Sequence, residues 1–121
     1  AVVSKLDIDE NNITLLGFSQ GTILSYAIAL NYPSMIKNII GLSGYLEQEM
    51  IYNNYYKDEL KNISCYASHG EQDQIIPMDW AQNSYETLLL KGLNINFHTY
   101  PVGHGVSQKN FYDLREWLLK H

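Results

Sequence analysis

Cysteine is nearly missing from this chain, and long apolar runs are missing altogether. The single Cys65 among 121 residues cannot form a disulfide within the chain, which fits a reducing compartment, so we expect a cytoplasmic protein. No apolar run approaches the roughly 20 residues that span a bilayer, so we expect no integral membrane segment. We also expect no signal peptide, because the first residues have neither a basic lead nor a long apolar stretch.

Positive charge is scarce as well. Eight Lys and Arg stand against 13 Asp and Glu, which gives a formal net charge of −5, and the cations are scattered along the chain. This balance argues against nucleic acid or an anionic membrane as a partner. No spacing of His, Cys, Asp and Glu resembles a metal site, and no phosphate-binding loop is present, so we expect no metal and no cofactor.

The chain does contain the pentapeptide G-F-S-Q-G at residues 17–21, which follows an apolar run at 13–16 and precedes a helical pattern. Strand, G-x-S-x-G and helix in this order are typical of a nucleophile elbow. Gly17 and Gly21 would leave room for its tight turn. The turn would present the Ser19 hydroxyl at a helix N-terminus, where negative charge is favoured. Taken alone, the motif also fits an ordinary N-cap serine.

Strands and helices alternate along the chain. Apolar and alternating runs predict strands at 13–18, 37–44, 63–68 and 94–100. Helical patterns predict a helix that starts after Ser19 and ends at residue 31 or 32, one at about 79–91, and one capped by Ser107. This alternation is typical of an α/β fold with about four parallel strands and flanking helices. The run at 13–18 shows almost no polar alternation, which predicts a strand buried on both faces.

Three polar residues follow three of these strands. Ser19 follows the first strand, Asp73 the third and His104 the fourth. Since the carboxyl ends of parallel strands share one edge of the sheet, we expect the three residues to meet there. A nucleophile, a base and an anion that orients the base are the groups needed for ester hydrolysis, and Ser, Asp, His is the α/β-hydrolase order. Taken alone, Asp73 and His104 also fit roles in exposed turns, and Glu71 competes with Asp73 as the anion.

An oxyanion hole needs two backbone donors. One should be the N–H of Gln20, directly after the proposed nucleophile. The other usually comes from a glycine-rich loop after an earlier strand, and no such loop precedes residues 13–18. The chain also begins without methionine and opens in mid-pattern, with residues 1–9 fitting in part the tail of a helix. We therefore expect it to be a piece of a longer polypeptide.

Several blocks resemble the phospholipase/carboxylesterase family of α/β-hydrolases, the group that includes acyl-protein thioesterases. They are G-F-S-Q-G at 17–21, L-S-G at 42–44, H-G-E-Q-D-Q-I-I-P at 69–77 and Y-x-x-x-H at 100–104. The resemblance implies Ser19 as nucleophile, Asp73 as orienting acid and His104 as base. It also implies hydrolysis of small carboxylic esters or thioesters without a cofactor. Thr22 departs from the family pattern, which often has a second glycine there.

The resemblance also bears on how much of the fold is present. Family members carry roughly another 80–100 residues upstream, which brings a domain to its usual size. We therefore expect residues 1–121 to form a single truncated α/β-hydrolase domain, the C-terminal half, without the N-terminal strands and the oxyanion loop. Ile13–Phe18 would then be an open, apolar strand edge, through which the chain could form a homodimer or an aggregate.

The sequence thus favours a serine hydrolase that works through an acyl-enzyme, and two alternatives remain open. One is a non-catalytic interaction module that keeps the hydrolase frame, although all three candidate residues are retained. The other is a dienelactone-type or peptidase-type α/β-hydrolase, which the G-F-S-Q-G block makes less fitting.

Overall fold

A computed structural model describes residues 12–52 and 57–121, and its centre is a four-stranded parallel sheet. The strands are β1 (Ile13–Phe18), β2 (Ile36–Leu42), β3 (Ser64–Gly70) and β4 (Asn94–Tyr100), and they lie side by side in chain order. This confirms the predicted α/β class. The helix tail expected within residues 1–9 lies outside the described residues.

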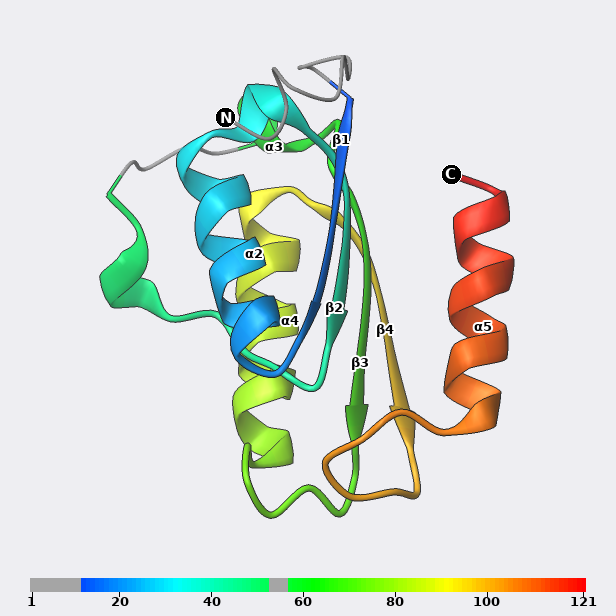
Figure 1. Cartoon of the computed structure of the whole chain (residues 1–121). Helices are drawn as coiled ribbons and strands as arrows, with labels where there is room; N and C mark the ends of the chain where they lie inside the picture. The colour runs from blue at the N-terminus through cyan, green and yellow to red at the C-terminus, as the bar shows by residue number, and fades with distance from the viewer. Residues whose placement is uncertain (1–11, 53–56) are drawn as a thin grey trace.

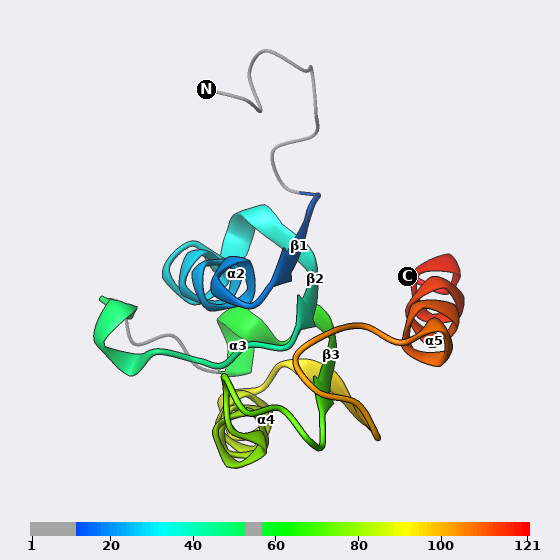
Figure 2. The ribbon, with the colours of Figure 1, turned by 60° about the horizontal axis from the view of Figure 1, so that its bottom comes forward.

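Helices cover both faces of the sheet. They are α2 (Gln20–Asn31), α3 (Lys57–Leu60), α4 (Met78–Lys91) and α5 (Gln108–Leu119), with single 3₁₀ turns at Pro33–Met35 and Gln48–Met50. Figures 1 and 2 show α2, α3 and α4 on one face and α5 on the other. Crossovers through α2 and α4 return the chain to the start of the next strand, so all four strands run the same way.

Local sequence signals set the helix ends. Pro33 lies two residues after the last residue of α2 and cannot continue the helix. Gly92 ends α4 with φ 110°, a left-handed conformation that favours glycine. The Ser107 hydroxyl accepts a hydrogen bond from the Asn110 N–H at 3.1 Å and so caps α5, as the sequence predicted.

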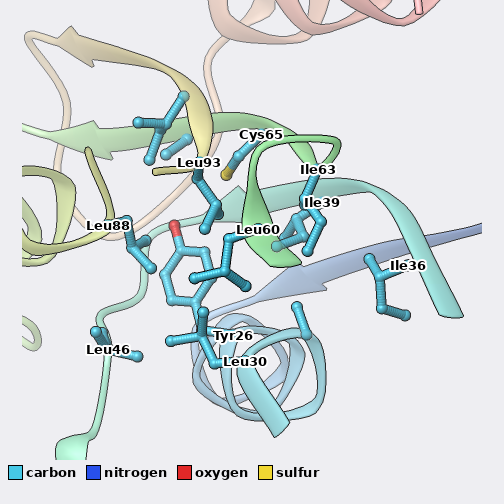
Figure 3. Packing of buried hydrophobic residues seen from close by; sticks show 13 residues of the cluster. Tyr26, Leu30, Ile36, Ile39, Leu46, Leu60, Ile63, Cys65, Leu88 and Leu93 are labelled. Carbon is cyan, nitrogen blue, oxygen red and sulfur yellow. The ribbon is translucent and has the colours of Figure 1, made fainter. Parts of the chain in front are cut away.

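The two central strands divide their side chains between two cores, because successive residues of a strand face opposite sides. Ile39 and Cys65 point toward α2 and α4 and pack in the larger cluster, which Figure 3 shows with Tyr26 and Leu60 among its members. On the opposite face, Ile40, Leu42 and Tyr66 pack against Leu114 and Trp117 of α5. The central strands are therefore buried on both faces.

The expectation that the first strand is buried on both faces is wrong for the described chain. β1 pairs only with β2, and alternate residues of β1 are exposed, with Leu16 at 62% and Phe18 at 44%. The other side chains of β1, Ile13 and Leu15, pack against the cluster under α2. Apolar sequence alone cannot tell a central strand from an edge strand, since burial depends on which neighbours are present.

Candidate active site

Ser19 lies in the turn between β1 and α2, in a conformation that few residues adopt. Its φ is 57°, one of two positive values for non-glycine residues in the described chain. Its N–H donates to the Leu42 carbonyl at 2.8 Å, which ties the turn to the end of β2. The Ser19 hydroxyl makes no capping bond to α2. The alternative of an ordinary N-cap serine is therefore excluded, and the hydroxyl is held away from the helix.

The turn requires glycine at one of the two expected positions. A Cβ atom on Gly17 would overlap the backbone of Gly21, so β1 and α2 could not approach this closely with any other residue at position 17. A Cβ atom on Gly21 would meet nothing within 4 Å among the residues that the structure describes. Among the described residues, the steric need for glycine therefore falls on position 17 and not on position 21.

Thr22, the departure from the family pattern, is part of what holds the turn. Its buried hydroxyl lies 2.8 Å from the Gly17 carbonyl and 2.8 Å from the Leu42 carbonyl, and it shares its one proton between them. A glycine at this position could not make either bond. The hydroxyl thus joins the end of β1, the start of α2 and the end of β2.

His104 reaches Ser19 from the loop after β4. Its Nε2 lies 3.0 Å from the Ser19 hydroxyl oxygen, although 85 positions separate the two residues in the chain. The Phe18 ring lies beside the imidazole, with centroids 5.1 Å apart and planes tilted by 44°. The imidazole is therefore fixed by a hydrogen bond on its edge and an aromatic ring against its side.

Asp73 completes the chain of hydrogen bonds. Its Oδ2 lies 2.7 Å from His104 Nδ1, and its Oδ1 accepts from the N–H groups of Ile75 and Ile76 at 2.9 Å each. Burial alone would raise the pKa of Asp73, but the hydrogen bonds from His104, Ile76 and Ile75 outweigh it and lower the pKa below its usual value. The carboxylate is therefore ionised at neutral pH and accepts from the imidazole.

Glu71, the competitor for this place, lies elsewhere. Its Oε2 accepts a hydrogen bond from the Thr99 hydroxyl at 2.9 Å, in an exposed position. Cys65 is buried in the core, which raises the pKa of its thiol to about 12 and makes it a poor nucleophile. The structure thus brings together Ser19, His104 and Asp73, and leaves Glu71 out.

The arrangement has the order of groups that nucleophilic catalysis uses: hydroxyl, imidazole, carboxylate. Gln20 begins α2, where the first N–H groups have no carbonyl partner inside the helix and the helix dipole favours negative charge. An open hollow of about 270 Å³ lies beside the imidazole, lined by Gln72, Gln74, Ile75, Gly103 and His104. Ile75 is 69% exposed there, which gives the hollow an apolar wall.

Sequence reasoning missed two contacts of this site. The first is Phe18, whose position directly before the serine is the signal that could have placed its ring near the base. His69 begins the H-G-E-Q-D block and ends a predicted strand, a position that by itself indicates a structural role. It is buried and hydrogen-bonded there, but it also contacts Asp73, and its spacing of four residues from that aspartate was the available signal.

Two further features are at issue in the described residues: a cluster of metal ligands and a helix that could span a membrane. Within residues 12–52 and 57–121, no three His, Cys, Asp or Glu side chains lie close enough together to hold a metal ion. In the same part of the chain, every helix is too short or too polar to cross a membrane.

The parallel sheet and the serine turn at its carboxyl edge define part of an α/β-hydrolase fold. A crystal structure of a carboxylesterase from Bacillus cereus superposes with a TM-score of 0.86 at 18% identity, covering 98% of this chain and 54% of that one. The sequence narrows the class: the model of the phospholipase/carboxylesterase family matches residues 2–121, and the chain belongs to that family.

Individual relatives agree with this assignment. A probable carboxylesterase from Arabidopsis thaliana, SOBER1-like, is 30% identical over 112 residues, which are 92% of this chain and 43% of the relative. Acyl-protein thioesterase 1 from Yarrowia lipolytica is 27% identical over 114 residues, 92% of this chain and 50% of the relative. The chain therefore belongs to a family of ester hydrolases, and it spans about half the length of the curated relatives it matches.

Proposed function

We propose that this chain carries the catalytic triad of a serine hydrolase that cleaves carboxylic esters or thioesters through an acyl-enzyme. The observation that carries the proposal is the continuous hydrogen-bond chain from the Ser19 hydroxyl to His104 (3.0 Å) and from His104 to Asp73 (2.7 Å). In this proposal Ser19 is the nucleophile, His104 the general base and Asp73 the anion that orients and stabilises the imidazole.

The reaction would run in two halves. Ser19 Oγ attacks the carbonyl carbon of the substrate while its proton passes to His104 Nε2, and the carbonyl oxygen becomes an oxyanion. The tetrahedral intermediate collapses, the bond to the leaving oxygen or sulfur breaks, and the imidazolium returns the proton to the leaving group. A water molecule then attacks the acyl-enzyme while His104 takes one of its protons. The bond between the acyl carbon and Ser19 Oγ breaks, His104 gives that proton to Ser19 Oγ, and the acid product leaves.

The oxyanion would be stabilised first by the N–H of Gln20, at the N-terminus of α2. A second donor is needed, and because the chain spans 43% of the length of the Arabidopsis relative, we assign that donor to polypeptide beyond this chain. Loss of one oxyanion donor costs about 10²–10³-fold in rate. We therefore expect weak turnover from the 121-residue chain alone and full turnover from the polypeptide of natural length.

The hollow beside His104 supports a small ester or thioester as substrate. Its volume of about 270 Å³ is just below the usual range of small-molecule sites, which fits a small substrate, and the exposed Ile75 side chain offers an apolar contact for an acyl group. The chain's net charge of −5 gives no attraction for a polyanionic ligand.

Labelling with a fluorophosphonate probe tests the proposal. Such a probe reacts with an activated serine, so we expect it to modify Ser19 in the polypeptide of natural length, together with hydrolysis of short p-nitrophenyl esters. Ser19→Ala should abolish labelling and lower kcat by roughly 10⁶-fold. Ser34→Ala, at an exposed serine after α2, is the matched control and should change neither. Labelling that persists in Ser19→Ala would refute the assignment and favour a non-catalytic role for this site.

A second proposal concerns the open edge of the sheet. β1 pairs only with β2, and an apolar hollow of about 360 Å³ lies beside it, lined by Ile13, Leu15, Ile28, Tyr32, Met35 and Ile36. Exposed apolar edge strands pair with other strands. We therefore propose that the isolated chain associates with a second copy through Ile13–Phe18 when no other strand covers this edge.

A further inference from the structure

His69, the second-to-last residue of β3, is buried directly behind the carboxylate of Asp73. The His69 ring is 1% exposed, and its Nε2 lies 2.7 Å from the Ile76 carbonyl oxygen and 3.2 Å from Asp73 Oδ2. Both neighbours are hydrogen-bond acceptors, so Nε2 must carry a proton and donate. Asp73 Oδ2 is the same oxygen that accepts from His104, so His69 and His104 approach one carboxylate oxygen from two sides.

The Ile76 carbonyl belongs to the turn that holds Asp73. Asp73 Oδ1 accepts from the N–H groups of Ile75 and Ile76, which curls residues 73–76 around the carboxylate. The hydrogen bond from His69 to the Ile76 carbonyl attaches this turn to β3. The Asp73 N–H also donates to the Gly70 carbonyl at the end of β3, at 3.2 Å, so the His69 bond is the side-chain part of what holds the carboxylate relative to the sheet.

We propose that His69 is a positioning residue for the triad: it fixes Asp73 so that Oδ2 points at His104 Nδ1. This inference rests on the proposed function, in which Asp73 orients the base. His69 touches no reacting atom and acts only through Asp73. It differs from a merely structural residue because it sets the geometry of one hydrogen bond, the 2.7 Å contact between His104 and Asp73.

The two ring nitrogens of His69 allow a matched pair of variants. Its Nδ1 is buried and has no hydrogen-bond partner among the residues that the structure describes, so only Nε2 works in this site. The side-chain nitrogen of glutamine reaches the place of Nε2, whereas that of asparagine reaches the place of Nδ1. His69→Gln therefore keeps a donor toward the Ile76 carbonyl. His69→Asn removes that donor, although its side chain carries the same amide group as that of glutamine.

The two variants should separate in kcat, measured with short p-nitrophenyl esters in the polypeptide of natural length. A misplacement of about 1 Å in a catalytic constellation costs on the order of 10²-fold, so we expect such a loss of kcat for His69→Asn with KM little changed. His69→Gln should retain most of the activity. The low-field NMR signal of the proton between His104 and Asp73 should persist in His69→Gln and disappear or shift in His69→Asn.

Other results would overturn the proposal. It fails if His69→Asn folds and keeps both kcat and the low-field signal, or if His69→Gln loses as much as His69→Asn. Nitrogen-15 NMR of the unaltered protein is a test that needs no variant: a His69 ring protonated only at Nδ1 would contradict the assigned donor. Asp73→Asn separates a failure of the proposed function from a failure of the role of His69. If Asp73→Asn is active, the proposed function is refuted. If Asp73→Asn is inactive but His69→Asn is active, only the role of His69 is refuted.

Discussion

Gly70 lies directly beneath Gly103, so the end of β3 supports the loop that carries His104. A Cβ atom on Gly70 would overlap the carbonyl groups of Gly103 and Val102. Further bonds fix the same contact: Glu71 N–H donates to the Tyr100 carbonyl at 2.8 Å, and Gln72 N–H donates to the Val102 carbonyl at 3.0 Å. The loops after β3 and β4 are therefore held against each other, and these are the loops that carry Asp73 and His104.

We accordingly predict that Gly70→Ala lowers kcat of the natural-length polypeptide by roughly 10–100-fold, because the added methyl group displaces the loop that carries His104. Steady-state kinetics on a short p-nitrophenyl ester measures the effect. Gly105→Ala is the matched control: a Cβ atom there meets nothing within 4 Å among the described residues, so kcat should change little. Equal rates for the two variants would mean that the loop tolerates displacement.

Asp73 and Glu71 can be separated by a second pair of variants. Asp73→Asn removes the anion that accepts from His104, and we expect a loss of kcat of roughly 10³–10⁴-fold. Glu71→Gln disturbs only the exposed bond to Thr99 and should leave kcat nearly unchanged. A larger effect from Glu71→Gln than from Asp73→Asn would reverse the assignment of the orienting acid.

The parallel sheet and the meeting of Ser19, Asp73 and His104 were predictable because they follow from chain order alone. Alternation of strands and helices implies parallel strands, and parallel strands bring their carboxyl ends to one edge. The choice between Asp73 and Glu71 was open from spacing, and a resemblance to a family decided it before geometry did. Glu71 and Asp73 are two residues apart in a turn, so the carboxylate of either could face the base. The hydrogen bonds from the Ile75 and Ile76 N–H groups hold the Asp73 carboxylate in that place.

Other features were beyond the sequence because they depend on contacts between distant segments. Thr22 is unremarkable in a helical pattern, yet its hydroxyl serves the end of a strand 20 positions away. The exposure of Leu16 and Phe18 likewise depends on the layer over their face of the sheet, where α5 packs on β2 and β3, and the apolar composition of Ile13–Phe18 does not reveal this. Periodicity reports which faces are apolar, and packing decides which of them are covered.

Thr22 should contribute to the stability of the serine turn. Thr22→Val keeps the shape of the side chain but leaves the Gly17 and Leu42 carbonyls without the hydroxyl, so we expect the free energy of unfolding to fall by about 1–3 kcal/mol. Thr22→Ser retains the hydroxyl and should lose less. Urea denaturation of the two variants measures the difference, and a Thr22→Val protein as stable as Thr22→Ser would show that the hydroxyl contributes nothing.

The lowered pKa of Asp73 predicts a loss of stability in acid. A carboxyl group whose pKa is lower in the folded state than in the unfolded state stabilises the fold above its unfolded pKa, and this contribution is lost as the pH falls through the folded pKa. Thermal unfolding from about pH 5 down to about pH 2 should therefore show a falling Tm. Asp73→Asn cannot titrate at this position, so its Tm should fall less steeply. Parallel slopes would contradict a lowered pKa for Asp73.

The open edge of the sheet makes a prediction for the isolated 121-residue chain. Leu16 is 62% exposed on β1, and a lysine there places charge on the pairing edge, which opposes strand association. Size-exclusion chromatography with light scattering should show dimers or larger species for the unaltered chain and a shift toward monomer for Leu16→Lys. Leu90→Lys adds the same charge on α4, at a residue that is 75% exposed, and should leave association unchanged. A stable monomer of the unaltered chain would refute association through Ile13–Phe18, and equal shifts from both lysines would assign the effect to net charge.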